Sequence, residues 1–459
     1  MIILKLFAGL FIAWMLGHLI IRFFDPGKKL SAFEDMALSY LVGQGSVTLL
    51  LFLLFLLPIA HQSLIITLLV VGSFAVKMFY DKSGHWRNKK ISFGIFSGFF
   101  LKRKNIIIVL LLIFLVSSLF IKISYSFVEA CSKPEYAWDA AGNWTLAGKN
   151  YFYAEKYRTD KVVEELKNTV NSYPRGLSLM HYWLFWWMGE ANDQWSKMIF
   201  PVELLCLLVI FYCGLKPARG QLGALVFVCF LCSAPIFLYH STIGYADLTK
   251  TVYFAAGMIY FYRWIQTNQE LYFWSFALPL AFTSWIKMEG RILYAIGFVL
   301  LLLYLWRDSK ETLRSKIVHI GEYLLLFMVI GLPWQLFVLF NQLPGQEGWL
   351  SFSFYRFLEF HAKVYELLFL GGSWGMFWVL AAGTTLFFFK RQLSGRNFYL
   401  LAAILLFYGN LLFIYLCFSD TVDFMLLTFN RVLLPIYPVI VFNMGCVLPS
   451  LKIDEELVV

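Results

Sequence analysis

The chain has 459 residues, of which 60% are hydrophobic and 14% are charged, and its formal net charge is +10. A soluble domain averages about 45–50% apolar and about 25% charged residues, so this composition excludes an ordinary soluble protein. Many apolar runs exceed the roughly 18 residues that span a bilayer. The sequence therefore predicts an all-α polytopic membrane protein.

The positive charge lies mainly between the apolar runs. Of the 38 Lys and Arg residues, 19 fall in short gaps at 22–29, 82–104, 216–219, 307–316 and 390–396. This placement is typical of cytoplasmic loops in membrane proteins. It argues against a nucleic-acid partner and for contact with membrane lipids.

About 13 transmembrane helices are predicted from the apolar runs. They cover 3–24, 36–58, 62–80, 104–123, 198–215, 221–240, 249–266, 271–287, 290–306, 318–340, 366–389, 398–417 and 432–449. The basic gap at 81–104 sets that side as cytoplasmic, so the N-terminus and the polar insert 124–197 face outward. We expect a multi-pass protein of the cell inner membrane whose functional face is periplasmic.

The insert 124–197 is predicted to carry helices that lie on the membrane surface. Residues 175–190 are rich in Trp and Tyr but short for a span, at 1.5 Å of rise per residue. If this segment crossed the membrane, every later basic gap would face outward, so an interfacial helix is favoured. A second surface helix is expected at 160–170, where apolar residues recur at helical spacing.

The outward turns collect a concentrated set of polar residues. The insert supplies Glu135, Asp139, Asn143 and Lys149, the next turns supply Tyr245, Asp247, Lys287 and Glu289, and Arg431 opens the last span. A carboxylate can accept the proton of an attacking hydroxyl, and cations can stabilise a departing phosphate. This set matches the displacement of a lipid phosphate by an alcohol.

Each of these residues also has a purely structural interpretation. Lys287 could extend to the lipid headgroups, and Asp139 could cap the helix that follows it. Asp247 could form a satisfied ion pair, and His181 and His240 are more often packing residues than site residues. Convergence on one membrane face favours the functional interpretation.

Five motifs, in order, resemble those of bacterial GT-C glycosyltransferases. They are Trp138-Asp139-Ala140 with Asn143-Trp144 and Lys149, Tyr173-Pro174 before an aromatic helix, Gly244-Tyr245-Ala246-Asp247, Lys287-Met288-Glu289-Gly290, and Arg431 with Pro435. The branch that the chain resembles includes protein O-mannosyltransferases, the lipid A aminoarabinose transferase and galacturonosyltransferases of the lipopolysaccharide core.

The resemblance implies a role for each matching residue. Asp139 would be the catalytic base or orient the acceptor, and Asp247 would help to hold the acceptor or a metal. Lys287 and Arg431 would bind the phosphate of a polyprenyl-phosphate-linked sugar, and the transfer would be inverting. The acceptor could be a glycan, a lipid or a protein. The first motif lacks a second adjacent acid, because Glu135 lies four residues upstream, so a divalent cation as cofactor stays open.

The resemblance also suggests three regions. Residues 1–104 would form an N-terminal three-helix extension, 105–306 the GT-C-like catalytic core with the loop 124–197, and 307–459 a variable set of C-terminal helices. Two other functions stay open. One is a secondary transporter or lipid flippase, and the other is an O-antigen ligase or polymerase.

Overall fold

The computed structural model describes residues 1–57, 59, 61–82, 106–157, 162–167, 172–344, 354–418 and 428–449. The protein is 83% helical, and the described residues contain no β-strand. Seven described helices are long and apolar enough to cross a membrane, or eight if one bent pair counts as a single span. The protein is thus an all-α, multi-pass membrane protein, while the number thirteen stays a prediction.

The first helices are α1 (Ile2–Phe24), α2 (Ala32–Phe55), α3 (Gln62–Lys82) and α5 (Ile106–Ser132). The insert forms α6 (Thr145–Tyr157), α7 (Val162–Lys167), α8 (Gly176–Met188) and α9 (Asp193–Ser196). Then follow α10 (Ile199–Leu231), α11 (Pro235–His240), α12 (Ala246–Thr267), α13 (Glu270–Ile286) and α14 (Gly290–Arg307). The last are α15 (Leu313–Leu326), α16 (Leu332–Phe340), α17 (Phe354–Tyr365), α18 (Phe377–Phe387), α19 (Phe389–Gln392), α20 (Asn397–Phe418) and α22 (Ile436–Val447).

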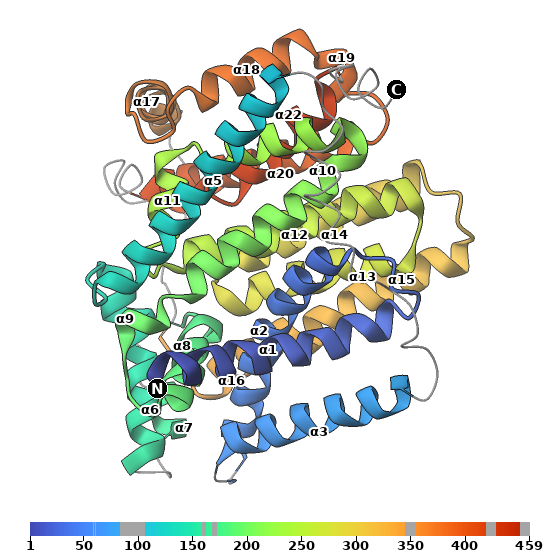
Figure 1. The fold of residues 1–459 in the computed structure, drawn as a ribbon. Helices are drawn as coiled ribbons and strands as arrows, with labels where there is room; N and C mark the ends of the chain where they lie inside the picture. The colour runs from blue at the N-terminus through green and yellow to red at the C-terminus, as the bar shows by residue number, and fades with distance from the viewer. Residues whose placement is uncertain are drawn as a thin grey trace.

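The helices α10, α12, α13 and α14 form the centre of the molecule (Figure 1). The N-terminal helices α1 to α3 lie on one side of this centre, and α17 to α22 lie on the other. Hydrogen bonds join α2 to the centre, because Trp285 Nε1 donates to Thr48 Oγ1 at 2.9 Å and Gln44 Nε2 donates to Glu203 at 2.6 Å. The predicted N-terminal extension therefore shares one core with the helices that follow it.

The helix α10 reverses direction at Gly220, which has a φ of 69°. Before the reversal, Phe211 packs edge-to-face against Phe442 of α22, with ring centroids 5.6 Å apart. Just before Gly220, Arg219 hydrogen-bonds the carbonyls at the end of α22, whereas Tyr437 at the start of α22 donates to Leu231 at 2.8 Å. The two halves of α10 thus run in opposite directions along α22, as the separate predicted segments 198–215 and 221–240 require.

Two other predicted spans are interrupted. The span at 318–340 becomes α15 and α16, which meet at a 43° bend beside a π-helical turn at Phe327–Gly331. Pro333 at the start of α16 lacks the N–H that would continue the helical ladder. The span at 366–389 is broken before α18, where Gly372 and Gly375 have positive φ values.

The polar insert packs as helices at one end of the molecule, where α6, α8 and α9 lie together (Figure 1). At 13 residues, α8 is about 20 Å long and too short to cross a bilayer. Its Trp183 is fully buried and donates through Nε1 to the Gly9 carbonyl of α1 at 3.0 Å. Of the helix expected at 160–170, α7 is described, and the rest lies outside the described residues.

Candidate functional site

The start of α12 and the end of α13 place the carboxylate of Asp247 beside the ammonium group of Lys287. Asp247 lies in the first turn of α12, and Lys287 directly follows α13. Lys287 Nζ lies 3.0 Å from Asp247 Oδ1, and Lys250 Nζ, one helical turn after Asp247, lies 3.4 Å from the same oxygen. Since α12 and α13 run in opposite directions, the start of one meets the end of the other.

The connection from α13 to α14 depends on Gly290. A Cβ atom at this position would lie 1.7 Å from the carbonyl oxygen of Thr283, so only glycine allows the two helices to approach this closely. The hydroxyl of Thr283 donates to the Gly290 carbonyl at 2.8 Å and closes the turn. This geometry gives a physical reason for the glycine in the Lys287-Met288-Glu289-Gly290 motif.

Arg431 joins both aspartates. Its Nη2 donates to Asp139 Oδ2 and also to Asp247 Oδ2, the latter at 2.9 Å, and its Nε lies 3.2 Å from Asp247 Oδ2. The guanidinium carbon lies 4.3 Å from the centroid of the Tyr245 ring, which forms a cation–π contact. Asp139 and Arg431 are 292 residues apart in the sequence.

We call Asp139, Asp247, Lys250, Lys287, Glu289 and Arg431 the charged cluster. Glu289 joins it through an oxygen 3.5 Å from Lys287 Nζ. The cluster contains three carboxylates and three cations, so it is close to neutral overall. Opposite charges at these distances offset much of the cost of burial.

The insert reaches the cluster through a small apolar contact. Ala137 and Ala140 pack against Ile243 and Tyr245, and Ser126 of α5 and Ser241 share a hydrogen bond of 2.7 Å. Asp139 precedes a π-helical turn, and its side chain makes no cap hydrogen bond. The carboxylate therefore pairs with Arg431 instead of capping the helix that follows.

Burial divides the cluster into an inner and an outer part. The side chains of Asp247 and Lys250 are each 1% exposed, whereas those of Arg431 and Asp139 are 23% and 33% exposed. Beside Asp139, the side chain of Trp138 is 86% exposed. Asp139 is thus the aspartate that a molecule from outside can reach, and Asp247 is the one that holds the cations in place.

Glu135 lies against the turn at Gly244 and forms no ion pair within the described residues. Both of its carboxylate oxygens are buried and lack a hydrogen-bond partner among the described residues. Gly244, whose φ is 73°, leaves room for it, because a Cβ there would lie 2.3 Å from Glu135 Oε2. Burial raises the pKa of Glu135 to about 7, although nearby Lys197 opposes the rise. A carboxyl group of this kind exchanges protons near neutral pH.

The other predicted residues take different positions. Tyr245 and Glu289 belong with the charged cluster, as described above. Asn143 Oδ1 accepts a hydrogen bond from Arg175 at 3.3 Å, and Lys149 Nζ lies 2.6 Å from Asp193. Asn143 and Lys149 thus hold the insert together. Neither forms a hydrogen bond or ion pair with Asp139 or Asp247 in the described structure.

Lys250 was not predicted as a site residue. This lysine lies inside a predicted span, where hydropathy gives no information about side-chain direction. Its spacing of three residues from Asp247 was the available signal, since such residues share one helix face.

His181 and His240 are both buried. His181 Nδ1 shares a hydrogen bond of 2.9 Å with Ser196, so a packing role accounts for it. His240 has its ring centroid 5.8 Å from that of Tyr245, next to the cluster. Burial lowers the pKa of His240 to about 4, so this imidazole is neutral at pH 7.

An apolar groove of about 1020 Å³ lies elsewhere on the molecule, along α1, α2, α5 and α10. Its lining includes Phe11, Tyr40, Leu119, Tyr212 and Val228. None of the residues of the charged cluster lines it.

Among the described residues, one group of side chains is spaced to hold a metal ion. It consists of Glu270, His319 and Glu322, at the far end of α13 from Lys287. At the charged cluster, Arg431 already occupies the position between Asp139 and Asp247. The structure therefore gives no support for a metal shared by these two aspartates.

No protein-family model matches the chain, and no curated protein or solved structure matches it.

Proposed function

We propose that the protein is an inverting glycosyltransferase that moves a sugar from a polyprenyl-phosphate donor to a hydroxyl acceptor at the periplasmic membrane face. The observation that carries the proposal is the contact of Arg431 with both Asp139 and Asp247, with Lys287 on the second oxygen of Asp247. Four separate segments of the chain thus supply acids and cations to one partly exposed place.

The cations suit a phosphate leaving group. Arginine presents five N–H donors in a planar fork, and lysine adds a point charge, so the pair can hold several phosphate oxygens. When a donor phosphate binds Arg431 and Lys287, it competes with the aspartates for the same N–H groups. Asp247 keeps Lys250 and holds Lys287 near the phosphate, while Asp139 is released toward the acceptor.

The released Asp139 can then act as general base. The acceptor hydroxyl oxygen forms a bond to the anomeric carbon, and the bond from that carbon to the phosphate oxygen breaks. The proton of the hydroxyl passes to Asp139, and polyprenyl phosphate leaves with the negative charge that Lys287 and Arg431 stabilise. The exposed Trp138 provides an aromatic face beside this carboxylate, against which a sugar ring can pack.

The proposal is tested by sugar transfer from a synthetic polyprenyl-phosphate donor with purified Asp139→Asn protein. We expect a loss of at least about a hundredfold, the typical contribution of a general base. Glu190→Gln is the matched control, because Glu190 is an exposed carboxylate after α8 and lies outside the cluster. A rate of Asp139→Asn within threefold of wild type would contradict the role of Asp139.

One contact set favours the alternative of a secondary transporter. Glu203 of α10 is fully buried and accepts hydrogen bonds from Gln44 at 2.6 Å and from Thr249 at 2.7 Å. An ionisable group inside a membrane helix is a common feature of transport pathways. Uptake of a lipid-linked sugar into sealed vesicles, with no covalent product and with loss in Glu203→Gln, would favour this second function.

A further inference from the structure

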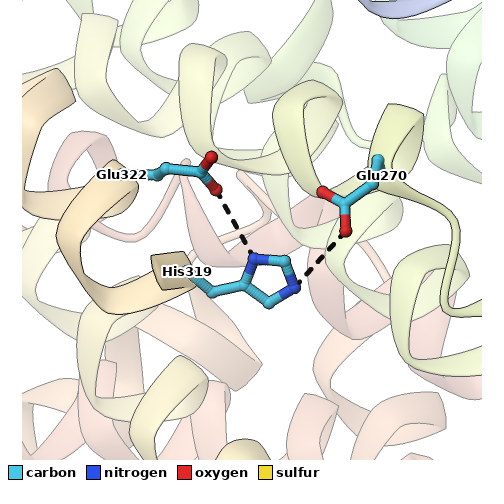
Figure 2. A group of neighbouring side chains, drawn as sticks. All are labelled: Glu270, His319 and Glu322. Carbon is cyan, nitrogen blue, oxygen red and sulfur yellow. Dashed lines mark hydrogen bonds and ion pairs between the residues drawn. The ribbon is translucent and has the colours of Figure 1, made fainter. Parts of the chain in front are cut away.

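Four side chains meet at the end of the molecule opposite the charged cluster. Glu270 begins α13, Glu311 lies between α14 and α15, and His319 and Glu322 lie one turn apart on α15. Figure 2 shows the imidazole of His319 between the carboxylates of Glu270 and Glu322. The 17 residues of α13 separate this group from Lys287 by about 25 Å, so the group is distinct from the proposed transferase site.

Packing holds the imidazole in one orientation. The ring of His319 stacks on Phe273 with centroids 4.5 Å apart, and it packs edge-to-face with Trp264, with centroids 5.3 Å apart. Its side chain is 4% exposed. A buried ring with both nitrogens directed at carboxylates is oriented before any ligand arrives, which lowers the entropy cost of binding.

Within the described part of the chain, no lysine or arginine forms an ion pair with these carboxylates. Among the described residues, His319 is the only ion-pair partner of Glu270, Glu311 and Glu322. Three carboxylates around one histidine leave a net negative charge, which costs free energy because like charges repel at short range. A divalent cation would neutralise two of these charges.

The distances also fit a metal better than hydrogen bonds. His319 Nδ1, the nitrogen free to bind a metal, lies 3.5 Å from Glu322 Oε2. Charge-assisted hydrogen bonds are shorter, at about 2.7–2.9 Å. Two ligand atoms on one tetrahedral zinc, each about 2.0–2.2 Å from the metal, lie about 3.4 Å apart. One ligand atom from each of Glu270, His319 and Glu322 lies within 4.8 Å of the other two.

We propose that Glu270, His319 and Glu322 bind a divalent transition-metal ion of the kind that accepts mixed nitrogen and oxygen ligands, such as Zn²⁺. Glu311 Oε2 lies 3.4 Å from Nε2, so this carboxylate favours the tautomer with the hydrogen on Nε2, which leaves Nδ1 to bind the metal. A carboxylate on the second ring nitrogen is the usual partner of a metal-bound histidine.

The metal would join the start of α13 to α15. Glu270 is 65% exposed, so its side chain can turn toward the metal without a change in the backbone. Because α13 carries Lys287 at its other end, the ion fixes one end of the helix that positions the transferase cluster. The metal proposal itself is independent of the proposed function, since it rests on different residues.

The test uses the full-length protein without an affinity tag, in detergent, stripped of metal with a chelator and titrated with Zn²⁺ alone. The variant is Glu270→Gln/Glu322→Gln, which keeps side-chain volume and removes two anionic ligands. The matched control is Glu190→Gln/Glu366→Gln, which changes two exposed carboxylates outside the group. Zn²⁺ content and the midpoint of thermal unfolding are measured for all three proteins.

We expect wild type and control to bind one Zn²⁺ per chain more than the variant, or to bind it at least tenfold more tightly. Zn²⁺ should raise the unfolding midpoint of wild type and control but not of the variant, because a ligand of the folded state stabilises that state. Equal Zn²⁺ binding by wild type and variant, or no binding by wild type, would overturn the proposal.

Discussion

At the scale of single residues, the two aspartates should behave differently when they are neutralised. Asp247 is 1% exposed and holds three cations, so Asp247→Asn leaves buried positive charges unpaired and should cost about 3–5 kcal/mol of stability. Asp139 is 33% exposed, so Asp139→Asn should cost under about 1 kcal/mol while it removes transfer. Thermal unfolding of the two variants in the same detergent measures the difference. Equal destabilisation would show that burial does not separate their roles.

Glu135 gives a prediction about pH. Burial raises its pKa in the folded protein to about 7 from an ordinary value near 4.5, so the folded state binds the proton more tightly than the unfolded state does. Its contribution to stability is complete below about pH 4.5 and is lost as the pH rises through about 7. The unfolding midpoint of wild type should therefore fall across this window relative to that of Glu135→Gln. Parallel curves for the two proteins between pH 4.5 and 8 would be evidence against this titration.

At the scale of elements, the turn between α13 and α14 sets the position of Lys287. In Gly290→Ala, the new Cβ would meet the Thr283 carbonyl, and this backbone cannot move unless the two helices separate. We expect loss of most of the folded protein. Gly321→Ala on α15 is the control, since nothing lies within 4 Å of its added Cβ, and alanine favours a helix by about 1 kcal/mol. Folded yield by size-exclusion chromatography distinguishes the two, and a stable Gly290→Ala protein would contradict this role of the turn.

The same elements show what the sequence could and could not predict. Apolar periodicity and turn residues locate most helices, and the turns after His240 and Ile286 begin close to their predicted places, whereas α5 continues to Ser132, beyond the predicted start of the insert at 124. The sequence could not predict the break before α18. Gly372 and Gly375 have positive φ values there, but a glycine can also lie within a regular helix, so its presence alone does not predict a break. It also could not place Lys250, whose partner is set by the close packing of α12 and α13.

At the scale of the whole molecule, charge and topology predict which residues share a face, but they do not predict contacts. Asp139, Asp247, Lys287 and Arg431 were expected on one face from the parity of the spans, and the structure brings their side chains together. The pairing of Arg431 with Asp139 requires Ala137 and Ala140 of the insert to pack against Ile243, in the turn before α12. Such a contact depends on three-dimensional packing between distant segments, which a single sequence does not specify.

The positions of the charged cluster and of the proposed metal site, at opposite ends of α13, lead to a prediction about the orientation of the protein in the membrane. The charged cluster lies where α12 begins and α13 ends, whereas Glu270 and His319 lie at the opposite end of α13. A reagent that cannot cross the membrane should therefore label Trp138→Cys in intact cells, since this side chain is 86% exposed beside Asp139. It should label Ser309→Cys, two residues before Glu311, only after the cells are permeabilised, because the positive-inside rule places the basic gap 307–316 in the cytoplasm. Mass spectrometry of the labelled peptides distinguishes these sites from the native cysteines. Labelling of both positions in intact cells would place the two clusters on the same side and contradict the proposed periplasmic site.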